Sequence, residues 1–298
     1  MDSLNKSFYF LIIYIIYYYN EMKKIINFTP TGTQTTRDNS NAPLLPNEII
    51  DEVHEAYDMG ITMVHVHARD PKDLSNTYKK DLYRPIIEGI RKHCPDLTIC
   101  VSLTGRLHPE FEKRSEVLEL YPDMGSLTMS SINFPKSASV NEPEMILKLI
   151  KKMDEYGVIP EIECFDSGMI NYTNYLIKKG ILNGPHYMNV IFGNIYNAQI
   201  DSATLASITN SLPLNTKVCF GGIGKDQLNS NVLGLIYGDG VRVGLEDNLY
   251  IRNKELTTNL ELLGRVHRIM NEMELSVLTP NEFKELGYVN KRNNNIRL

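Results

Sequence analysis

Short runs rich in β-branched residues alternate with amphipathic stretches along this chain, and the alternation recurs eight times. The runs cover 24–29, 62–67, 97–103, 126–130, 159–165, 187–192, 217–220 and 240–243. Apolar residues spaced three and four apart predict helices over 46–59, 82–94, 110–120, 142–156, 170–179, 202–211 and 226–237. Strands separated by helices pair in parallel through right-handed crossovers, so the pattern predicts an α/β fold, a (β/α)8 TIM barrel.

We expect a single domain over residues 22–298, because no linker or composition break divides the chain. An open doubly wound sheet is the alternative, but no GxGxxG follows the first strand. Asn141, three residues before Glu144, predicts the N-cap of the helix over 142–156. The stretch 257–273 predicts a closing helix, and the tail to Leu298 an extension for oligomer contacts.

The first 21 residues include the apolar, tyrosine-rich run FYFLIIYIIYYY, which is too short to span a bilayer as a helix. Its flanks lack the positive charge and the cleavage site of a signal peptide. Met22 comes directly before the first strand. We therefore expect residues 1–21 to be a dispensable extension or translated upstream sequence, and we expect no membrane partner.

Charge and cysteine content exclude some partners. The net charge is −5, and no run of Lys or Arg is present, so nucleic acid is not expected as a partner. The four cysteines lie far apart and form no CxxC pair. Three of them sit in apolar strand-like runs, where cysteine behaves as a small hydrophobe, so we expect free thiols and a cytoplasmic protein.

The segment MVHVHARD at 63–70 carries the clearest chemical signal. Side chains alternate along a strand, so His65 and His67 share one face while the valines beside them share the other. The valines suit the helix layer, and both imidazoles then face the barrel interior near the end of the strand. Two neutral imidazoles in this arrangement predict a divalent metal site, since Zn²⁺ binds such nitrogens.

A third ligand is expected from GVRVGLEDN at 240–248, where Glu246 and Asp247 follow the last strand. The alternative is that these two acids cap a following helix. Arg242 stands on an otherwise apolar strand, and a buried guanidinium needs an anionic partner. It could hold a substrate carboxylate or orient Asp247.

Further candidates follow other strand ends. Turns with exposed backbone N–H groups or hydroxyls predict substrate or phosphate binding; they contain Thr31, Gly32 and Gln34, then Ser102, Thr104 and Gly105, then Gly221 and Gly222. Glu161 and Glu163 share one face of the fifth strand, and two acids there are costly unless they serve the site.

These segments together resemble the β-keto acid cleavage enzyme family. They are TPTGTQTT, HVHARD, SLTGR, PEIECFDSG, FGGIG and VRVGLEDN, in the family's order and covering nearly the whole chain from Met22. The resemblance implies a zinc TIM barrel that condenses a β-keto acid with acetyl-CoA as co-substrate, giving acetoacetate and an acyl-CoA. It also implies a homo-oligomer, often a tetramer.

The resemblance assigns roles residue by residue. It implies metal binding by His65, His67 and Glu246, and catalysis by Arg242 and Asp247. A strand-three serine and a strand-five glutamate also line the family's site, which falls on Ser102 and Glu163, with Thr104 as the alternative to Ser102 because SLTGR departs from the commoner Ser-Thr-Gly-Gly.

The substrate stays open at this point. The best-known member of the family cleaves 3-keto-5-aminohexanoate in lysine fermentation. Some members carry an acid where this chain has Gln34, which weakens the case for an amino-keto acid. Two alternatives remain: an amidohydrolase-like zinc hydrolase, for which His186 is the only later histidine candidate on strands five and six, and a metal-stabilised binding protein without turnover.

Overall fold

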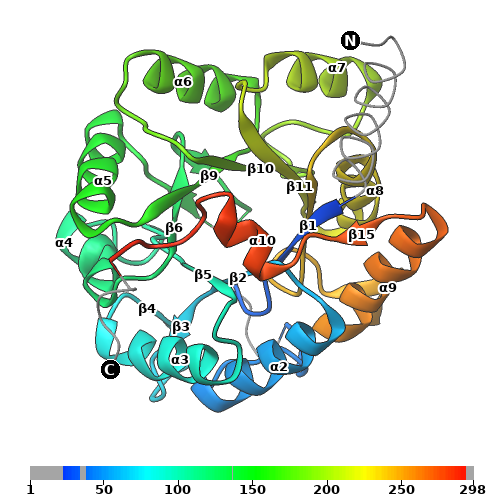
Figure 1. The fold of residues 1–298 in the computed structure, drawn as a ribbon, viewed down its shortest axis with the longest axis horizontal. Helices are drawn as coiled ribbons and strands as arrows, with labels where there is room; N and C mark the ends of the chain where they lie inside the picture. The colour runs from blue at the N-terminus through cyan, green and yellow to red at the C-terminus, as the bar shows by residue number, and fades with distance from the viewer. Residues whose placement is uncertain (1–22, 34–37, 136, 293–298) are drawn as a thin grey trace, which may run out of the picture.

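The computed structural model describes residues 23–33, 38–135 and 137–292, and eight parallel strands in it form a closed ring (Figure 1). The strands are β1 (Lys23–Phe28), β2 (Met63–Val66), β5 (Thr98–Val101), β6 (Met124–Thr128), β9 (Ile159–Cys164), β10 (His186–Phe192), β11 (Thr216–Gly222) and β12 (Gly240–Val243). β12 pairs with β1, with Val241 opposite Ile26, which closes the ring. The predicted (β/α)8 TIM barrel is confirmed.

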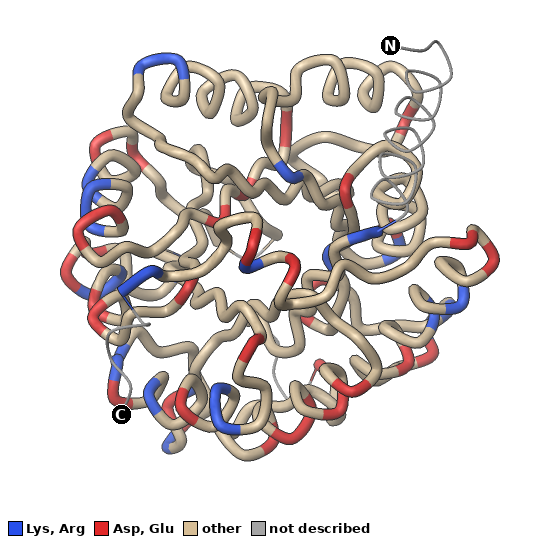
Figure 2. The backbone as a smooth tube through the Cα atoms, in the orientation of Figure 1, with Lys and Arg blue, Asp and Glu red and all other residues tan. Residues whose placement is uncertain are grey.

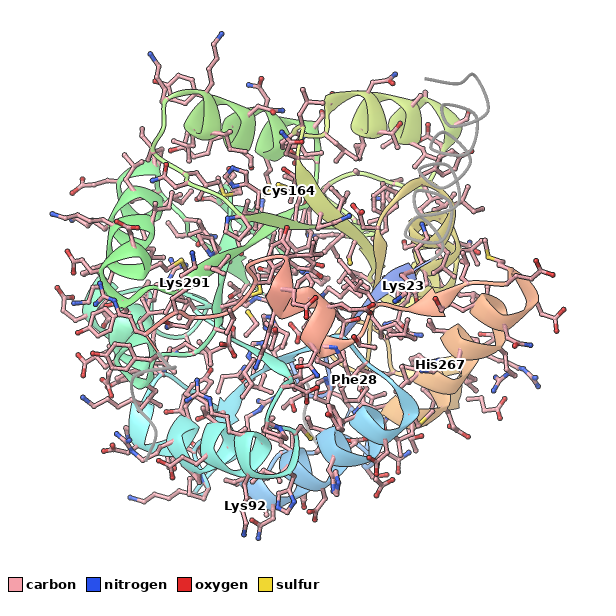
Figure 3. The ribbon with its side chains drawn as sticks, in the orientation of Figure 1. Lys23, Phe28, Lys92, Cys164, His267 and Lys291 are labelled. Carbon is pink, nitrogen blue, oxygen red and sulfur yellow. The ribbon has the colours of Figure 1, made fainter. Side chains whose placement is uncertain are left out.

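A helix follows each strand and covers the outside of the ring (Figure 1). The helices are α2 (Pro46–Met59), α3 (Lys80–His93), α4 (Phe111–Ser115), α5 (Pro143–Tyr156), α6 (Ser167–Lys178), α7 (Ser202–Ser211), α8 (Gln227–Tyr237) and α9 (Asn259–Glu272). Val64 and Val66 belong to the core between strands and helices, as expected from the alternation. In Figure 3, Cys164 lies between the strands and this outer layer.

Two local predictions were wrong. The stretch 110–120 is not one helix: α4 ends at Ser115 and continues as a 3₁₀ helix, η1 (Glu116–Leu120). Asn141 does not cap α5, whose N-cap is Glu142 without a side-chain hydrogen bond. The Asn141 side chain instead accepts from Arg114 and donates to the Ser130 carbonyl, so tertiary contacts take the groups that a cap would use.

The C-terminal tail closes the N-terminal end of the barrel. β15 (Ser276–Val277) pairs with the start of β1, and α10 (Pro280–Glu285) lies over the centre of the ring (Figure 1). Phe283 stacks on Tyr288 with ring centroids 4.3 Å apart, and both rings contact Tyr187 edge-on. The tail therefore packs on its own barrel rather than serving only as an extension for contacts between subunits.

Three small hairpins lie in the loops that follow β2, β6 and β12. They pair β3 (Ala68–Arg69) with β4 (Asn76–Thr77), β7 (Ile132–Asn133) with β8 (Ala138–Ser139), and β13 (Tyr250–Arg252) with β14 (Glu255–Leu256). Because each leaves the carboxyl end of a barrel strand, the hairpins build the end of the molecule opposite α10. Basic and acidic residues intermingle over the outer helices (Figure 2).

The predicted extension 1–21 and Gln34 lie outside the described residues. All four cysteines are buried free thiols, as expected. None of the described helices has the length and apolar character needed to cross a membrane.

Candidate active site at the carboxyl end of the barrel

The carboxyl ends of the strands surround a cavity of about 140 Å³. The side chains around it come from most of the barrel strands and their loops; they are Thr33, His65, His67, Ser102, Thr104, Arg106, Ser126, Thr128, Ile132, Phe134, Ser139, Glu163, Phe165, Ile191, Ile223, Arg242, Glu246 and Asp247. A cavity of about 150 Å³ accommodates a benzene-sized ligand. This one therefore suits a small organic acid.

Three of the predicted residues bring metal-binding atoms together. The Nε2 atoms of His65 and His67 lie 3.2 Å apart. Glu246 reaches them from the loop after β12, with Oε1 at 3.3 Å from His67 Nε2 and Oε2 at 3.9 Å from His65 Nε2. Both histidines are buried, and the side chain of Glu246 is 14% exposed.

The spacing of these atoms fits a zinc ion. Two ligands on one tetrahedral ion, each at about 2.0–2.1 Å, lie about 3.3–3.4 Å apart. The 3.2 Å and 3.3 Å separations at His67 match that edge. Burial lowers the pKa of His67 to about 4 even though Glu246 opposes the shift, so its imidazole is neutral and able to bind a metal.

Glu161 holds His65 in this orientation. Its Oε2 lies 2.5 Å from His65 Nδ1, which leaves Nε2 turned toward His67 and Glu246. Asn27 and Asn189 donate to the same carboxylate at 2.6 and 2.9 Å. Burial has the largest single effect and raises the pKa of Glu161, but His65, Arg242 and Cys100 together outweigh it and lower the pKa to about 2. A carboxylate behind a ligating imidazole fixes its tautomer and ring orientation.

Cys100 offers a sulfur to a second candidate group with His65 and Glu161. Burial raises the pKa of the Cys100 thiol well above its usual value, and its Sγ donates to Glu161 at 3.0 Å. A protonated thiol is a poor zinc ligand. The group containing His67 and Glu246 is therefore the better metal site.

Arg242 connects the metal site to the acids beside it. Its guanidinium donates through Nε to Asp247 Oδ2 at 2.8 Å, through Nη2 to Glu246 Oε1 at 2.8 Å, and through Nη1 to Glu163 Oε1 at 3.2 Å. The side chain is only 2% exposed. Of the two roles considered for Arg242, the geometry favours the orientation of Asp247.

Burial determines the direction of the pKa shift for two of the three acids that contact Arg242. It raises the pKa of both Glu163 and Asp247, and Arg242 offsets that effect only in part. Glu163 also accepts from Thr128 Oγ1 at 2.9 Å. A carboxylate whose pKa is moved toward neutrality is suited to accept and return a proton. The alternative that Glu246 and Asp247 cap a helix is wrong, because they lie in a turn well before α9.

The predicted substrate-binding residues do not all reach the cavity. Ser102 and Thr104 line it. Thr31 is fully buried and donates to the Pro43 carbonyl instead, and Gly105 packs against the Arg114 guanidinium. The two glycines that end β11 lie under the site: Gly221 packs against the side chain of Arg242, and Gly222 against α8.

One supporting residue, Asn259, was missed in the sequence, and Gly32 was given a different role. Gly32, predicted to bind substrate, has a φ of +56° and packs directly against Glu246. Asn259, on α9, donates to the Pro30 carbonyl at 2.9 Å and accepts from the Leu245 amide at 2.7 Å. It thereby ties the loop before Gly32 to the loop that carries Glu246. Its position as the first residue of a helix gave no signal of that role.

Arg106 is a further lining residue to which the sequence reasoning gave no role. It donates through Nη1 to Thr33 Oγ1 at 3.3 Å, and its guanidinium carbon lies 3.5 Å from the centroid of the Phe134 ring. Its place directly after SLTG, at the end of a strand, was the available signal.

His186 does not reach this site. It starts β10, at the end of the barrel opposite the cavity, and its carbonyl accepts from Tyr288. In the described part of β9 and β10 no histidine stands at the carboxyl end. The later ligands that an amidohydrolase-like site needs are therefore missing there.

Comparison with known proteins extends along almost the whole described chain. The model of the family described as beta-keto acid cleavage enzyme matches residues 23–287. The 3-keto-5-aminohexanoate cleavage enzyme of Acetoanaerobium sticklandii is 32% identical over 272 residues, covering 90% of this chain and 99% of that protein. The 3-oxoadipate:acetyl-CoA acetyltransferase of Cupriavidus necator is 33% identical, covering 86% and 91%.

Solved structures share the fold at lower identity. The apo structure of ObcA superposes with a TM-score of 0.73 at 17% identity, covering 84% of this chain and 66% of ObcA. The type I 3-dehydroquinate dehydratase of Clostridium difficile gives a TM-score of 0.54 at 10% identity, covering 84% and 93%. Both likenesses concern the barrel alone.

Proposed function

The chain belongs to the β-keto acid cleavage enzyme family, and from that premise we propose that it is a zinc-dependent enzyme that transfers an acyl group from a β-keto acid to coenzyme A. Acetyl-CoA is the co-substrate, and acetoacetate and a new acyl-CoA are the products. Relatives named as acetyl-CoA-dependent transferases of β-keto acids support this class of reaction.

One observation carries the proposal: side chains able to bind a zinc ion and the acids that hydrogen-bond to Arg242 line the same small cavity. His65, His67 and Glu246 would hold the metal. When bound, a zinc ion supplies a Lewis acid that polarises the keto oxygen of the substrate. The neighbouring Arg242 links Glu246 to Asp247, so the carboxylate of Asp247 would lie beside the keto group of a bound substrate.

At each of the two carbonyl carbons involved, one bond forms and one bond breaks. C2 of the β-keto acid bonds to the acetyl carbon, which loses its sulfur; C3 then gains the sulfur and separates from C2. We assign to Asp247 the proton transfer at the adduct that fragments between C2 and C3. Its raised pKa suits that role, and the bond from Arg242 Nε keeps its carboxylate oriented.

The remaining polar residues bind and orient. Glu163 holds Arg242 from the side opposite Asp247 and accepts from Thr128. Ser102 offers a hydroxyl at the end of β5, with Thr104 as the alternative two residues on. Apolar side chains of Phe165, Ile191 and Ile223 line the cavity and keep water from the reacting groups.

The substrate, the oligomeric state and the cellular location are proposed from the same family membership. The panel of substrates to test includes 3-keto-5-aminohexanoate, the compound of lysine fermentation named in two relatives. We propose a homotetramer, to be measured by light scattering, and place the enzyme in the reducing cytoplasm, which its four free thiols suit.

The test uses purified, metal-analysed protein, acetyl-CoA and a panel of β-keto acids, with acetoacetate and acyl-CoA followed by mass. We expect product from at least one acid, and no product from His65→Ala. Asp247→Asn should abolish turnover by at least about 100-fold while the metal content stays that of the wild type. Normal turnover in Asp247→Asn would overturn its role, and bound zinc without product from any acid would favour a hydrolase or a binding protein.

A further inference from the structure

We propose that Arg106 selects β-keto acids whose acyl chain ends in a second carboxylate. This inference rests on the proposed function and names the substrate class of that same site. It comes from the position of one guanidinium, the charges around it and the side chains between it and the reacting groups.

The guanidinium of Arg106 is held at the side of the cavity by two loops. Thr33, after β1, accepts its hydrogen bond, and Phe134, in the hairpin after β6, lies flat beneath it at 3.5 Å. All three residues line the cavity. Stacking on an aromatic ring fixes the plane of an arginine while its N–H edge stays available to an anion.

No ion pair joins Arg106 to a carboxylate among the described residues. Its one hydrogen bond within the described chain goes to the neutral hydroxyl of Thr33. The carboxylates of Glu246, Glu163 and Asp247 act on this guanidinium only through space, without a direct ion pair, so its N–H edge can still bind a carboxylate in a bidentate way.

The other guanidinium of the cavity is already neutralised. Arg242 donates to three carboxylates, those of Glu163, Glu246 and Asp247. A substrate carboxylate would compete with them. Of the two arginines that line the cavity, Arg106 is therefore the one that can recognise an added negative charge.

The side chains between the two arginines favour a chain with a distal acid. The carboxylate attached to C2 stays beside Asp247, where Ser102 and Thr128 offer hydroxyls at strand ends. Ile132 lines the cavity from the same hairpin as Phe134 and gives an aliphatic chain a surface to follow. A carboxylate at the far end of that chain reaches Arg106, whereas an ammonium group there is repelled.

Three six-carbon 3-oxo acids test the proposal: one ends in a carboxylate, one in a methyl group, and one carries an ammonium group at C5. Wild type should show the highest kcat/KM with the dicarboxylate. Arg106→Gln should lower kcat/KM for the dicarboxylate by about 100-fold and for the methyl-ended acid by less than about threefold, because only the former loses a charged hydrogen bond. Arg106→Glu should reverse the order of the dicarboxylate and the ammonium acid.

Arg84→Gln is the matched control, since Arg84 is exposed on α3 and distant from the cavity; all three kcat/KM values should stay at the wild-type level. An equal loss with all three acids in Arg106→Gln would mean that Arg106 binds the carboxylate at C2. A raised KM for acetyl-CoA with every acid would mean that it binds a phosphate of coenzyme A. Either result overturns the proposal.

A binding measurement separates this inference from the proposed reaction. Calorimetry with hexanedioate and hexanoate, neither of which has a keto group, needs no turnover. We expect wild type to bind the dicarboxylate at least about 10-fold more tightly, and Arg106→Gln to lose that difference. Equal affinities in wild type would reject the role of Arg106 even if cleavage is observed; a retained preference with no cleavage of any acid would reject the proposed reaction instead.

Discussion

Glu246 rests on a glycine that leaves no room for a side chain. A Cβ built on Gly32 would lie 2.3 Å from Glu246 Cγ, and the backbone there has a φ of +56°. Both the close approach and the left-handed conformation require glycine. The position of the carboxylate proposed to bind the metal therefore depends on a backbone contact between the loops that follow the first and the last strands.

Gly32→Ala should displace Glu246 and weaken zinc binding. We expect at least about a 10-fold rise in the dissociation constant for zinc, measured by chelator competition, with a circular dichroism spectrum like that of wild type. Gly180→Ala is the control, because that glycine also has a positive φ but nothing lies within 4 Å of the added methyl group. Equal zinc affinity in the two variants would contradict the role given to Gly32.

Glu161 gives a second prediction for single residues. Glu161→Gln keeps the size of the side chain but weakens the charged partner of His65 Nδ1, so zinc affinity should fall by about 10- to 100-fold. The measurement is zinc competition at fixed pH. Glu255→Gln, on the exposed hairpin strand β14, should leave the affinity unchanged. A wild-type zinc affinity in Glu161→Gln would show that His65 is oriented without it.

Alternation along strands predicted which residues face inward but not what each one contacts. It placed His65 with His67, and Glu161 with Glu163, on common faces. It could not separate the two glutamates, because their depths depend on the register between strands: Glu161 lies opposite Tyr187, and Glu163 opposite Asn189. The deeper carboxylate meets His65, and the other meets Arg242.

Helix α9 connects the two functional loops to the helix layer. Asn259, which ties those loops together, also donates to Glu52 Oε2 on α2 at 3.1 Å. Burial raises the pKa of Glu52 to about 7, an effect that the hydrogen bond from Asn259 only partly offsets. Near neutral pH, the packing of α2 against α9 is therefore sensitive to one proton.

This contact predicts a pH dependence of stability. Glu52 binds its proton more tightly in the folded chain, so its contribution is complete below about pH 4.5 and is lost as the pH rises through 7. The loss is about 3 kcal/mol at most, from about 1.4 kcal/mol per pKa unit. In urea denaturation, Glu52→Gln should be less sensitive than wild type to a change from pH 5 to pH 8.

Glu88→Gln, which alters an exposed acid on α3, should keep the wild-type dependence between those two pH values. If Glu52→Gln loses as much stability as wild type over that interval, the proton that is lost does not belong to Glu52.

Helices were predicted well where apolar residues recur regularly every three or four positions, as in α2 and α5. The errors fall where a side chain has several competing partners. Asn141 reads as a cap from its neighbours in the sequence, but Arg114 and Ser130 bind it in the fold. The short hairpins β3–β4 and β7–β8 carry too few residues for a periodic signal.

At the scale of the whole molecule, the C-terminal segment stabilises the barrel. Phe283 is fully buried against Tyr187 and Tyr288. Phe283→Ala should lower the free energy of unfolding by about 3–5 kcal/mol, measured by chemical denaturation. Leu286→Ala, at a side chain that is 50% exposed just after α10, should change it by less than about 0.5 kcal/mol. Similar midpoints for the two variants would show that the segment does not stabilise the barrel.

The seal that α10 forms across one end of the barrel also has a kinetic consequence. Under the proposed function, we expect substrates and products to pass through the opening at the carboxyl ends of the strands. Under the proposed function, we expect the keto acid to bind inside the cavity, and coenzyme A, which is too large for about 140 Å³, to lie across its mouth. Acetyl-CoA should therefore bind after the keto acid, and the acyl-CoA product should leave before acetoacetate. Steady-state rates should show this compulsory order, with acetoacetate a competitive inhibitor only against the keto acid.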